Sequence, residues 1–191
     1  MALVHRERVL RAATSSFLAH GYRSSVDHIA RRAGVAKQTV YHHFPSKDEL
    51  FKAVARGLAK HVLVELESEP RELRAALVRF AQAYRKRALG AQGIATFRAL
   101  VPEVPRFRAL ARAMYAGSAG VLVERLAEIL AKAMDAGELR RDDPVLAAEL
   151  LLGMLIGQDR VKRLFGVAAA GESDARRAER IVECFLRAYT P

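Results

Sequence analysis

The chain has 191 residues, of which 51% are hydrophobic, so it is long enough to bury a core and is not a disordered tail. Its formal net charge of +11 predicts a polyanionic partner, either nucleic acid or an anionic membrane surface. We expect no signal peptide, because the first residues are charged, and no membrane span, because the longest apolar run covers only 150–157. A cytoplasmic protein is therefore predicted. The single cysteine, Cys184, is expected to be a small buried residue of the last helix, with a redox sensor as the alternative.

Residue spacing along the chain predicts an all-α fold. Ala, Leu, Arg and Glu recur at helical intervals, and the long alternating runs that strands require are missing from the sequence. The first helix is expected over Val4–His20, with Val9, Ala13 and Phe17 on one apolar face. Gly21 is expected to end this helix as a left-handed residue.

Two short helices are predicted next. Ser24, with Asp27 three residues later, forms a capping-box pattern that predicts the start of the second helix, and Gly34 is expected to end it. The third helix is expected from Lys37 and must end before Pro45, because proline lacks a backbone donor and clashes with the preceding turn.

The rest of the chain is predicted to hold one long helix and six others. The sequence SKDE at 46–49 repeats the capping pattern and begins the long helix, and Asp143 followed by Pro144 is another strong start. The segment 166–173 is expected to be a mobile loop. The other helices are expected near 70–89, 94–101, 105–116, 119–136, 143–165 and 173–189.

The sequence KQTVYHHFPSK at 37–47 contains no carboxylate. Residues four apart share one face of a helix, so Ala36, Val40 and Phe44 should form an apolar stripe that packs inward. The remaining rows pair hydrogen-bonding residues: Lys37 with Tyr41, Gln38 with His42, and Thr39 with His43. A helix face that combines donors and aromatic rings without negative charge indicates contact with DNA phosphates and base edges.

The second and third predicted helices form a helix-turn-helix pattern, since only the short turn AGVA separates them. The second helix of such a motif enters the major groove, and eight helical residues span ~12 Å, about the width of that groove. We therefore predict two domains, a DNA-binding helix-turn-helix head at 1–50 and a larger helical domain at 51–191.

The stretch VLRAATSSFLAHGYRSSVDHIARRAGVAKQTVYHHFPSKDEL at 9–50 resembles the DNA-binding domain of TetR-type bacterial transcriptional regulators. The resemblance depends on four separate motifs: AA…F…GY, IA..AGV, TVYHHF and SK.EL. It implies a regulator that binds double-stranded operator DNA, with an all-α fold. The rest of the chain is similar to the family only in length and in the number of expected helices.

The resemblance also implies roles for eight residues of the head. Base or thymine-methyl contacts are implied for Lys37, Gln38, Tyr41 and His42. Phosphate contacts are implied for Ser25, Thr39, His43 and Lys47. Ala36 departs from the family pattern, because a Ser or Thr usually caps the recognition helix at this position. The loop between GY and the second helix is also one residue shorter than usual.

Two C-terminal segments suggest a homodimer. Residues 144–157 are apolar nearly all round, and the final helix carries a wide apolar stripe. The stripe comprises Ile181, Val182, Cys184, Phe185, Ala188 and Tyr189. The resembled family usually dimerises through a four-helix bundle, which would present two recognition helices to two half-sites. The alternative is that both segments simply fill the core of a monomer.

The resemblance further implies a small-molecule effector, bound between helices in an apolar cavity with a few polar groups. The candidate lining residues are Tyr84, Phe97, Arg98, Phe107, Met114, Tyr115, Met154 and Gln158, each of which has ordinary packing as its alternative. We expect a repressor that leaves its palindromic operator when the effector binds. The long helix from Ser46 would join the head to the effector domain.

Other functions are weighed as alternatives. A sequence-independent, nucleoid-type DNA-binding protein would have the same basic charge. An enzyme is disfavoured, because the chain has no phosphate-binding glycine loop and no helical pair of metal ligands. No cofactor and no metal are predicted. His42 and His43 are helix neighbours that point about 100° apart, so they cannot chelate one ion together.

Overall fold

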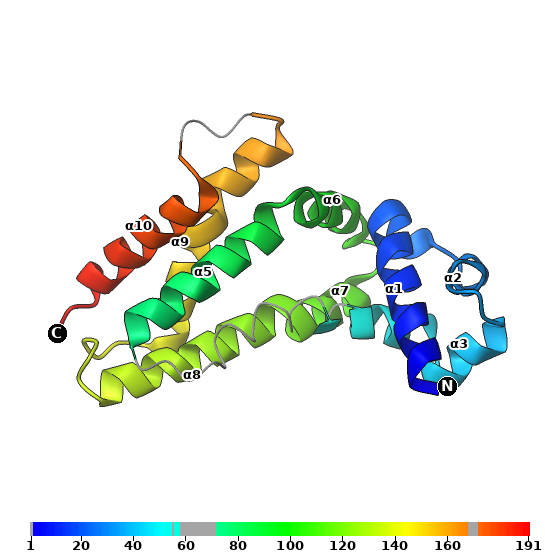
Figure 1. Ribbon diagram of the computed structural model, residues 1–191, viewed down its shortest axis with the longest axis horizontal. Helices are drawn as coiled ribbons and strands as arrows, with labels where there is room; N and C mark the ends of the chain where they lie inside the picture. The colour runs from blue at the N-terminus through cyan, green and yellow to red at the C-terminus, as the bar shows by residue number, and fades with distance from the viewer. Residues whose placement is uncertain (1, 55, 58–71, 168–171) are drawn as a thin grey trace. The chain divides into compact units, whose positions relative to one another are not determined.

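A computed structural model of the chain describes residues 2–54, 56–57, 72–167 and 172–191. All the regular structure of these residues is helical, which confirms the predicted all-α fold (Figure 1). The α-helices are α1 (Ala2–His20), α2 (Val26–Ala33), α3 (Lys37–His43), α5 (Leu73–Leu89), α6 (Ala91–Leu100), α7 (Arg108–Tyr115), α8 (Val121–Asp135), α9 (Pro144–Leu164) and α10 (Asp174–Ala188). Residues 47–54 and 56–57 are also helical. In this part of the chain no helix is long and apolar enough to span a bilayer.

The ends of α2 show how short polar residues and glycine delimit the helix-turn-helix. Ser25, one residue later than predicted, is the N-cap, and its hydroxyl oxygen accepts a hydrogen bond from the backbone N–H of His28 at 3.1 Å. Ser24 is instead buried, so the predicted capping box is wrong by one position. Gly34 ends the helix as predicted, with a φ of 63° that few other residues tolerate.

Three predicted helix starts farther along the chain, at Ser46, Asp143 and Ser173, are confirmed, whereas α6, α7 and α8 begin two or three residues from their predicted starts. The hydroxyl of Ser46 accepts from the backbone N–H of Glu49, and the carboxylate of Asp143 accepts from the first backbone N–H groups of α9. Ser173 caps α10 in the same way. The loop expected at 166–173 and the long helix after Ser46 lie partly outside the described residues, which exclude 168–171, 55 and 58–71.

The chain divides into two compact units. The N-terminal unit comprises Met1–Leu58 and Ala95–Ser118, and the C-terminal unit comprises Ala59–Ile94 and Ala119–Pro191. The boundaries therefore fall within α6 and within a π-helical turn, Ala116–Gly120. The predicted domain boundary at residue 50 stays a prediction.

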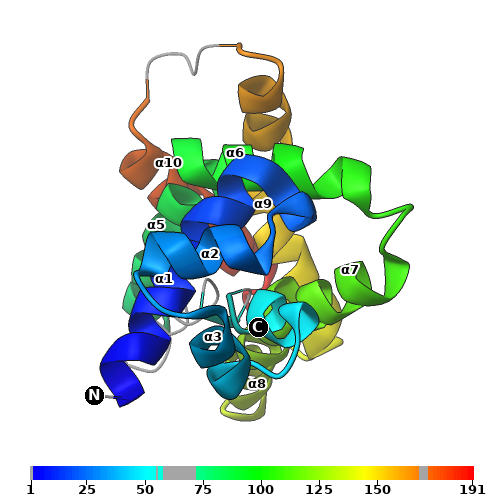
Figure 2. The same cartoon turned by 90° about the vertical axis from the view of Figure 1, so that its right-hand side faces the viewer.

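The N-terminal unit packs α1, α2 and α3 around one apolar core (Figure 2). Val9 and Ile29 are fully buried there, and Phe17 meets Phe51 edge to face with ring centroids 4.7 Å apart. Phe107, just before α7, packs against the same core. The core therefore joins the helix-turn-helix to residues that lie more than fifty positions later in the chain.

The C-terminal unit is built from α5, α8, α9 and α10. In Figure 1, α10 lies along α5, and α9 packs against α5, α8 and α10. Its core contains fully buried Phe80, Leu126 and Leu151 and the nearly buried Phe185. Burial of such side chains is the main favourable contribution to the stability of a helical bundle of this kind.

Cys184 does not occupy this core. The buried face of α10 is formed by residues three or four apart, including Ala178, Val182 and Phe185, whereas Cys184 lies off that face and is exposed. The prediction of a buried cysteine is therefore wrong. Only part of the apolar stripe predicted for the last helix packs in the core of the protomer, and Cys184 lies outside that part.

A buried arginine connects three helices of the C-terminal unit. Arg85 on α5 is 1% exposed and donates hydrogen bonds to the backbone carbonyl of Leu155 and to the carboxylates of Asp159 and Asp174, the latter two at 2.8 and 2.6 Å. Burial alone would raise the pKa of Asp174, but hydrogen bonds from Arg85 and Arg163 outweigh it and lower that pKa. The charges of this cluster thus compensate one another.

We expect Arg85→Ala to lower the free energy of unfolding by about 3 kcal/mol, because it removes a buried cation and leaves Asp159 and Asp174 with one arginine partner each, Arg177 and Arg163. The matched control is Arg74→Ala on the same helix, where the exposed pair with Glu183 should contribute below about 1 kcal/mol. Urea denaturation measures both changes. Equal losses from the two substitutions would contradict the role given to Arg85.

Candidate nucleic-acid interface

The inward side of α3 determines which residues of the helix face solvent. Val40 and Phe44 are 1% and 4% exposed and belong to the N-terminal core, as predicted. Ala36 was expected beside them but is exposed. It is the N-cap, with an extended backbone and no side-chain capping bond, so it precedes the helical face that Val40 belongs to.

The outward side of α3 carries the predicted base-contacting residues. Lys37, Gln38, Tyr41 and His42 are all exposed. Thr39 and His43 are half-buried. The structure therefore brings the six predicted α3 residues onto one short helix whose opposite side is held in the core, an arrangement that fits insertion into a major groove.

Lys37, the first residue on the outward side of α3, forms an ion pair. The ammonium of Lys37 lies 2.9 Å from a carboxylate oxygen of Asp27 on α2, and both side chains are about half exposed. The hydrogen bond from Lys37 to Asp27 raises the pKa of the lysine. Because exposed ion pairs of this kind contribute little stability, a nucleic acid can replace Asp27 as the partner of Lys37.

The start of α2 offers a second anion-binding element. Ser25 is exposed and caps a helix of eight residues, whose first backbone N–H groups have no acceptor within the helix and can bind an anion. Asp27 in the first turn lies close by, and its carboxylate is occupied by Lys37. This arrangement is compatible with the phosphate contact predicted for Ser25.

Lys47 has a partner that the sequence did not reveal. Its ammonium lies 4.2 Å from the centroid of the Tyr22 ring, and the Tyr22 hydroxyl donates to the carboxylate of Asp48. Partial burial lowers the pKa of Lys47. The lysine is therefore held at one place by an aromatic ring instead of extending freely into solvent.

The eight candidate effector residues are distributed over both units. Phe107 and Met114 pack against the N-terminal core, and Tyr84 stacks on Phe80 in the C-terminal core, where burial raises its pKa. Phe97, Arg98 and Tyr115 are exposed parts of the N-terminal unit, while Met154 and Gln158 are exposed on α9. Their shared role in effector binding stays a prediction.

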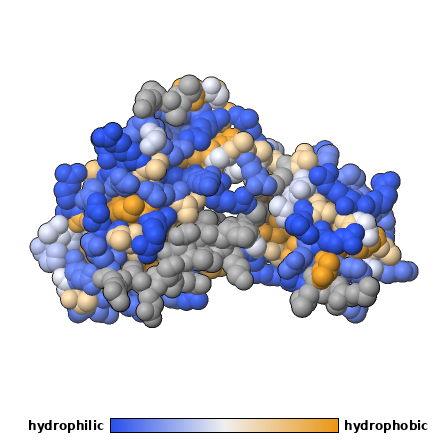
Figure 3. Space-filling model, in the orientation of Figure 1, coloured by the Kyte–Doolittle hydropathy of each residue, from blue (hydrophilic) through white to orange (hydrophobic). Residues whose placement is uncertain are grey.

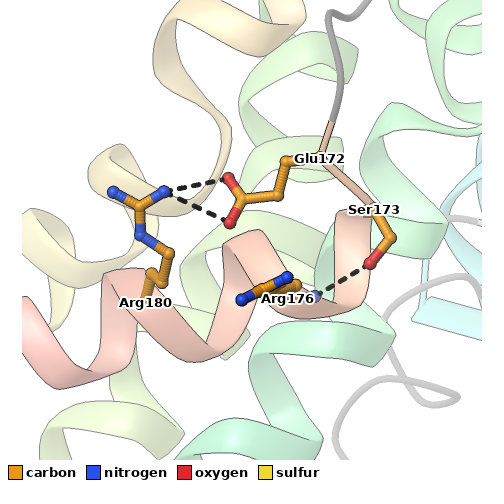
Figure 4. A pocket seen from close by; sticks show the side chains of 4 residues that line it. All are labelled: Glu172, Ser173, Arg176 and Arg180. Carbon is orange, nitrogen blue, oxygen red and sulfur yellow. Dashed lines mark hydrogen bonds and ion pairs between the residues drawn. The ribbon is translucent and has the colours of Figure 1, made fainter.

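A hollow of about 610 Å³ lies at the start of α10 (Figure 4). Glu172, Ser173, Arg176 and Arg180 line it. Both carboxylate oxygens of Glu172 face the guanidinium of Arg180, at 3.3 and 3.4 Å, and Ser173 is engaged in capping α10. With a polar and internally paired lining, this hollow differs from the apolar cavity expected for an effector.

Two family models match the chain. Residues 9–54 match the model of the bacterial regulatory proteins of the tetR family, and residues 75–191 match the C-terminal domain of AefR-like transcriptional repressors. The chain belongs to the TetR family. The resemblance predicted from the head is thus confirmed, and it extends to the C-terminal helices of this TetR-family regulator.

Solved structures share the whole fold. A TetR-family transcriptional regulator from Mesorhizobium loti is 28% identical, with a TM-score of 0.81, and the match covers 100% of this chain and 99% of that one. The flavonoid-responsive regulator FrrA is 31% identical, with a TM-score of 0.78 and coverage of 98% and 97%.

Curated relatives are similar over a shorter stretch. The transcriptional activator FasR from Mycolicibacterium smegmatis is 47% identical over 58 residues, which make up 30% of this chain and 25% of FasR. The matches span a third or less of the length of the curated relatives.

Three side chains near the interface escaped the sequence-based prediction. Tyr22 was noted only as part of the GY motif, Asp27 only as a capping residue, and Phe107 only as a candidate effector contact. Their observed contacts, with Lys47, Lys37 and Tyr22 respectively, join residues that are 25, 10 and 85 positions apart. No local pattern in the sequence indicates such long-range pairs.

We expect Gln38→Ala to change the preferred base at one position of each half-site by ~1–3 kcal/mol, because an amide can pair with a base edge in the major groove. Lys47→Ala should weaken binding to all duplexes alike and reduce the salt dependence, as loss of a phosphate contact does. Binding titrations on matched and single-base-substituted duplexes measure both effects. Identical behaviour of the two variants would contradict the division into base and phosphate contacts.

Proposed function

We propose that this TetR-family protein is a repressor that binds a palindromic operator as a homodimer and is released by a small-molecule effector. The observation that carries the proposal is the solvent face of α3. Its polar and aromatic side chains project outward because Val40 and Phe44 anchor the other face, and Ser25 and Lys47 flank it. Double-stranded DNA offers base edges and phosphates that match these groups.

The outer face of α9 supports dimerisation. Leu146, Leu150 and Met154 are 46%, 47% and 44% exposed and lie on one face, opposite the residues that α9 contributes to the core. Gly153 and Gly157 lie next to this face with open space around their α-carbons, so a second helix can approach closely. Figure 3 shows hydrophobic residues at the surface of the C-terminal unit. A second protomer would remove this apolar surface from water.

The direction of regulation is proposed from the relatives. The C-terminal model is named for AefR-like repressors and covers residues 75–191, whereas the activator FasR is similar only over 58 residues. Repression is therefore favoured. FrrA is described as flavonoid-responsive, so we further propose a planar aromatic effector for this protein.

Two alternatives have less support. A sequence-independent DNA-binding protein needs positive charge but no outward row of residues such as Gln38 and Tyr41. Enzymatic activity has no support in the site, and the family that the chain belongs to consists of transcriptional regulators. We propose the cytoplasm, where the operator DNA is, as the location of the protein.

Selection of bound duplexes from random DNA should recover a palindrome whose half-sites are centred about one helical turn apart, because two symmetry-related α3 helices would read it. The selected duplex should bind at least about 10³-fold more tightly than random DNA at the same salt concentration. Recovery of unrelated sequences with equal affinity and steep salt dependence would instead support sequence-independent binding.

Leu150→Glu should convert the dimer to a monomer, because it places two charges in the apolar contact between α9 helices. Light scattering during gel filtration measures the mass, and operator affinity should fall in parallel. The control is Val104→Glu, a comparably exposed apolar residue of the N-terminal unit, which should leave the mass unchanged. A dimer that persists in Leu150→Glu would exclude this face as the interface.

A further inference from the structure

The side chain of Tyr22 has five neighbours from different parts of the N-terminal unit, one of which is Phe17, stacked on it with ring centroids 6.4 Å apart. Phe51 and Phe107 meet it edge to face, with centroid distances of 5.2 and 4.9 Å. The hydroxyl donates to Asp48, and the ammonium of Lys47 lies 4.2 Å from the ring centroid. The two phenylalanines and the Asp48 carboxylate therefore fix the ring, and the fixed ring offers its face to a cation.

Lys47 needs such support to act as a phosphate ligand. A lysine side chain has four rotatable bonds, and the freedom that it loses on binding weakens the contact. Lys47 is half-buried in the protein without DNA, so part of this freedom is already lost. An ammonium above an aromatic face still has donors available for an anion on its other side.

We propose that Tyr22 is a positioning residue that holds the ammonium of Lys47 in place for a DNA phosphate. This inference rests on the proposed DNA-binding function and deepens it. Tyr22 does not itself touch DNA in this proposal; it acts through Lys47. Phe107 and Phe51 support the ring from its edges, so the phosphate contact depends on the N-terminal core as well as on the surface.

The competing explanation is that Tyr22 only fills space in the core. Tyr22 is half-buried, and any large apolar side chain in its place could pack against Phe17, Phe51 and Phe107. A filling role predicts effects on stability alone. A positioning role predicts an effect on the salt dependence of DNA binding, which reports the number of phosphates that the protein neutralises.

The test measures the affinity for a duplex selected by the protein, between 50 and 200 mM salt, by fluorescence anisotropy. Lys47→Ala defines the loss of the contact, in which the slope of log K against log salt should fall by about 0.9 per half-site. Tyr22→Leu should reproduce this fall, and the double variant should show no further fall. Tyr22→Phe keeps the ring and should keep the slope of the unchanged protein.

Val9→Ala is the matched control for a filling role, because Val9 is fully buried in the same core but is not one of the side chains that hold the Tyr22 ring. It should lower the melting temperature and leave the salt slope unchanged. Thermal melting of every variant establishes that the binding measurements are made on folded protein.

Three outcomes would overturn the inference in distinguishable ways. If Lys47→Ala lowers the slope and Tyr22→Leu does not, the positioning role is wrong while the proposed function stands. If neither variant lowers the slope, Lys47 makes no phosphate contact and the assignment of DNA contacts fails with the inference. A fall in Tyr22→Phe equal to that in Tyr22→Leu would assign the effect to the hydroxyl and Asp48 and so also contradict a role of the ring.

Discussion

The burial of Val40 and Phe44 is the constraint on which the DNA-binding surface depends. A helix of seven residues has little stability of its own, so α3 is held by its tertiary contacts. Because these two side chains are fixed in the core of α1 and α2, the rotation of α3 about its axis is fixed as well. Gln38, Tyr41 and His42 then face solvent without further support. Polar specificity at the surface thus follows from apolar packing beneath it.

Two lysines of the head are held in place by neighbouring side chains. Lys37 is paired with Asp27, and Lys47 lies over Tyr22. Both partners give weak, exposed or half-exposed interactions, which hold a cation in place without consuming all of its donors. A surface of this kind is preorganised for an anionic partner, because less conformational entropy remains to be lost on binding.

The two faces of α9 have different roles in the C-terminal unit. Its inner face contributes buried residues such as Leu151, and Arg85 joins α9 to α5 and α10 through Leu155 and Asp159. Its outer face stays apolar and exposed. In the dimer that we propose, a second protomer would cover that exposed face.

The sequence by itself determined the helices, the caps at Gly34, Ser46 and Asp143, and the two faces of α3, because these depend on residues within about one turn of one another. The same local logic identified the family from residues 9–50. Only the tertiary structure decided that Ser25 caps α2, that Cys184 is exposed, and that Phe107 packs on Tyr22. Such outcomes depend on which surfaces meet when distant segments pack, and a linear pattern does not encode the distance between segments. The same physical reason left the effector residues undetermined, since a cavity is defined by several helices together and by no single one of them.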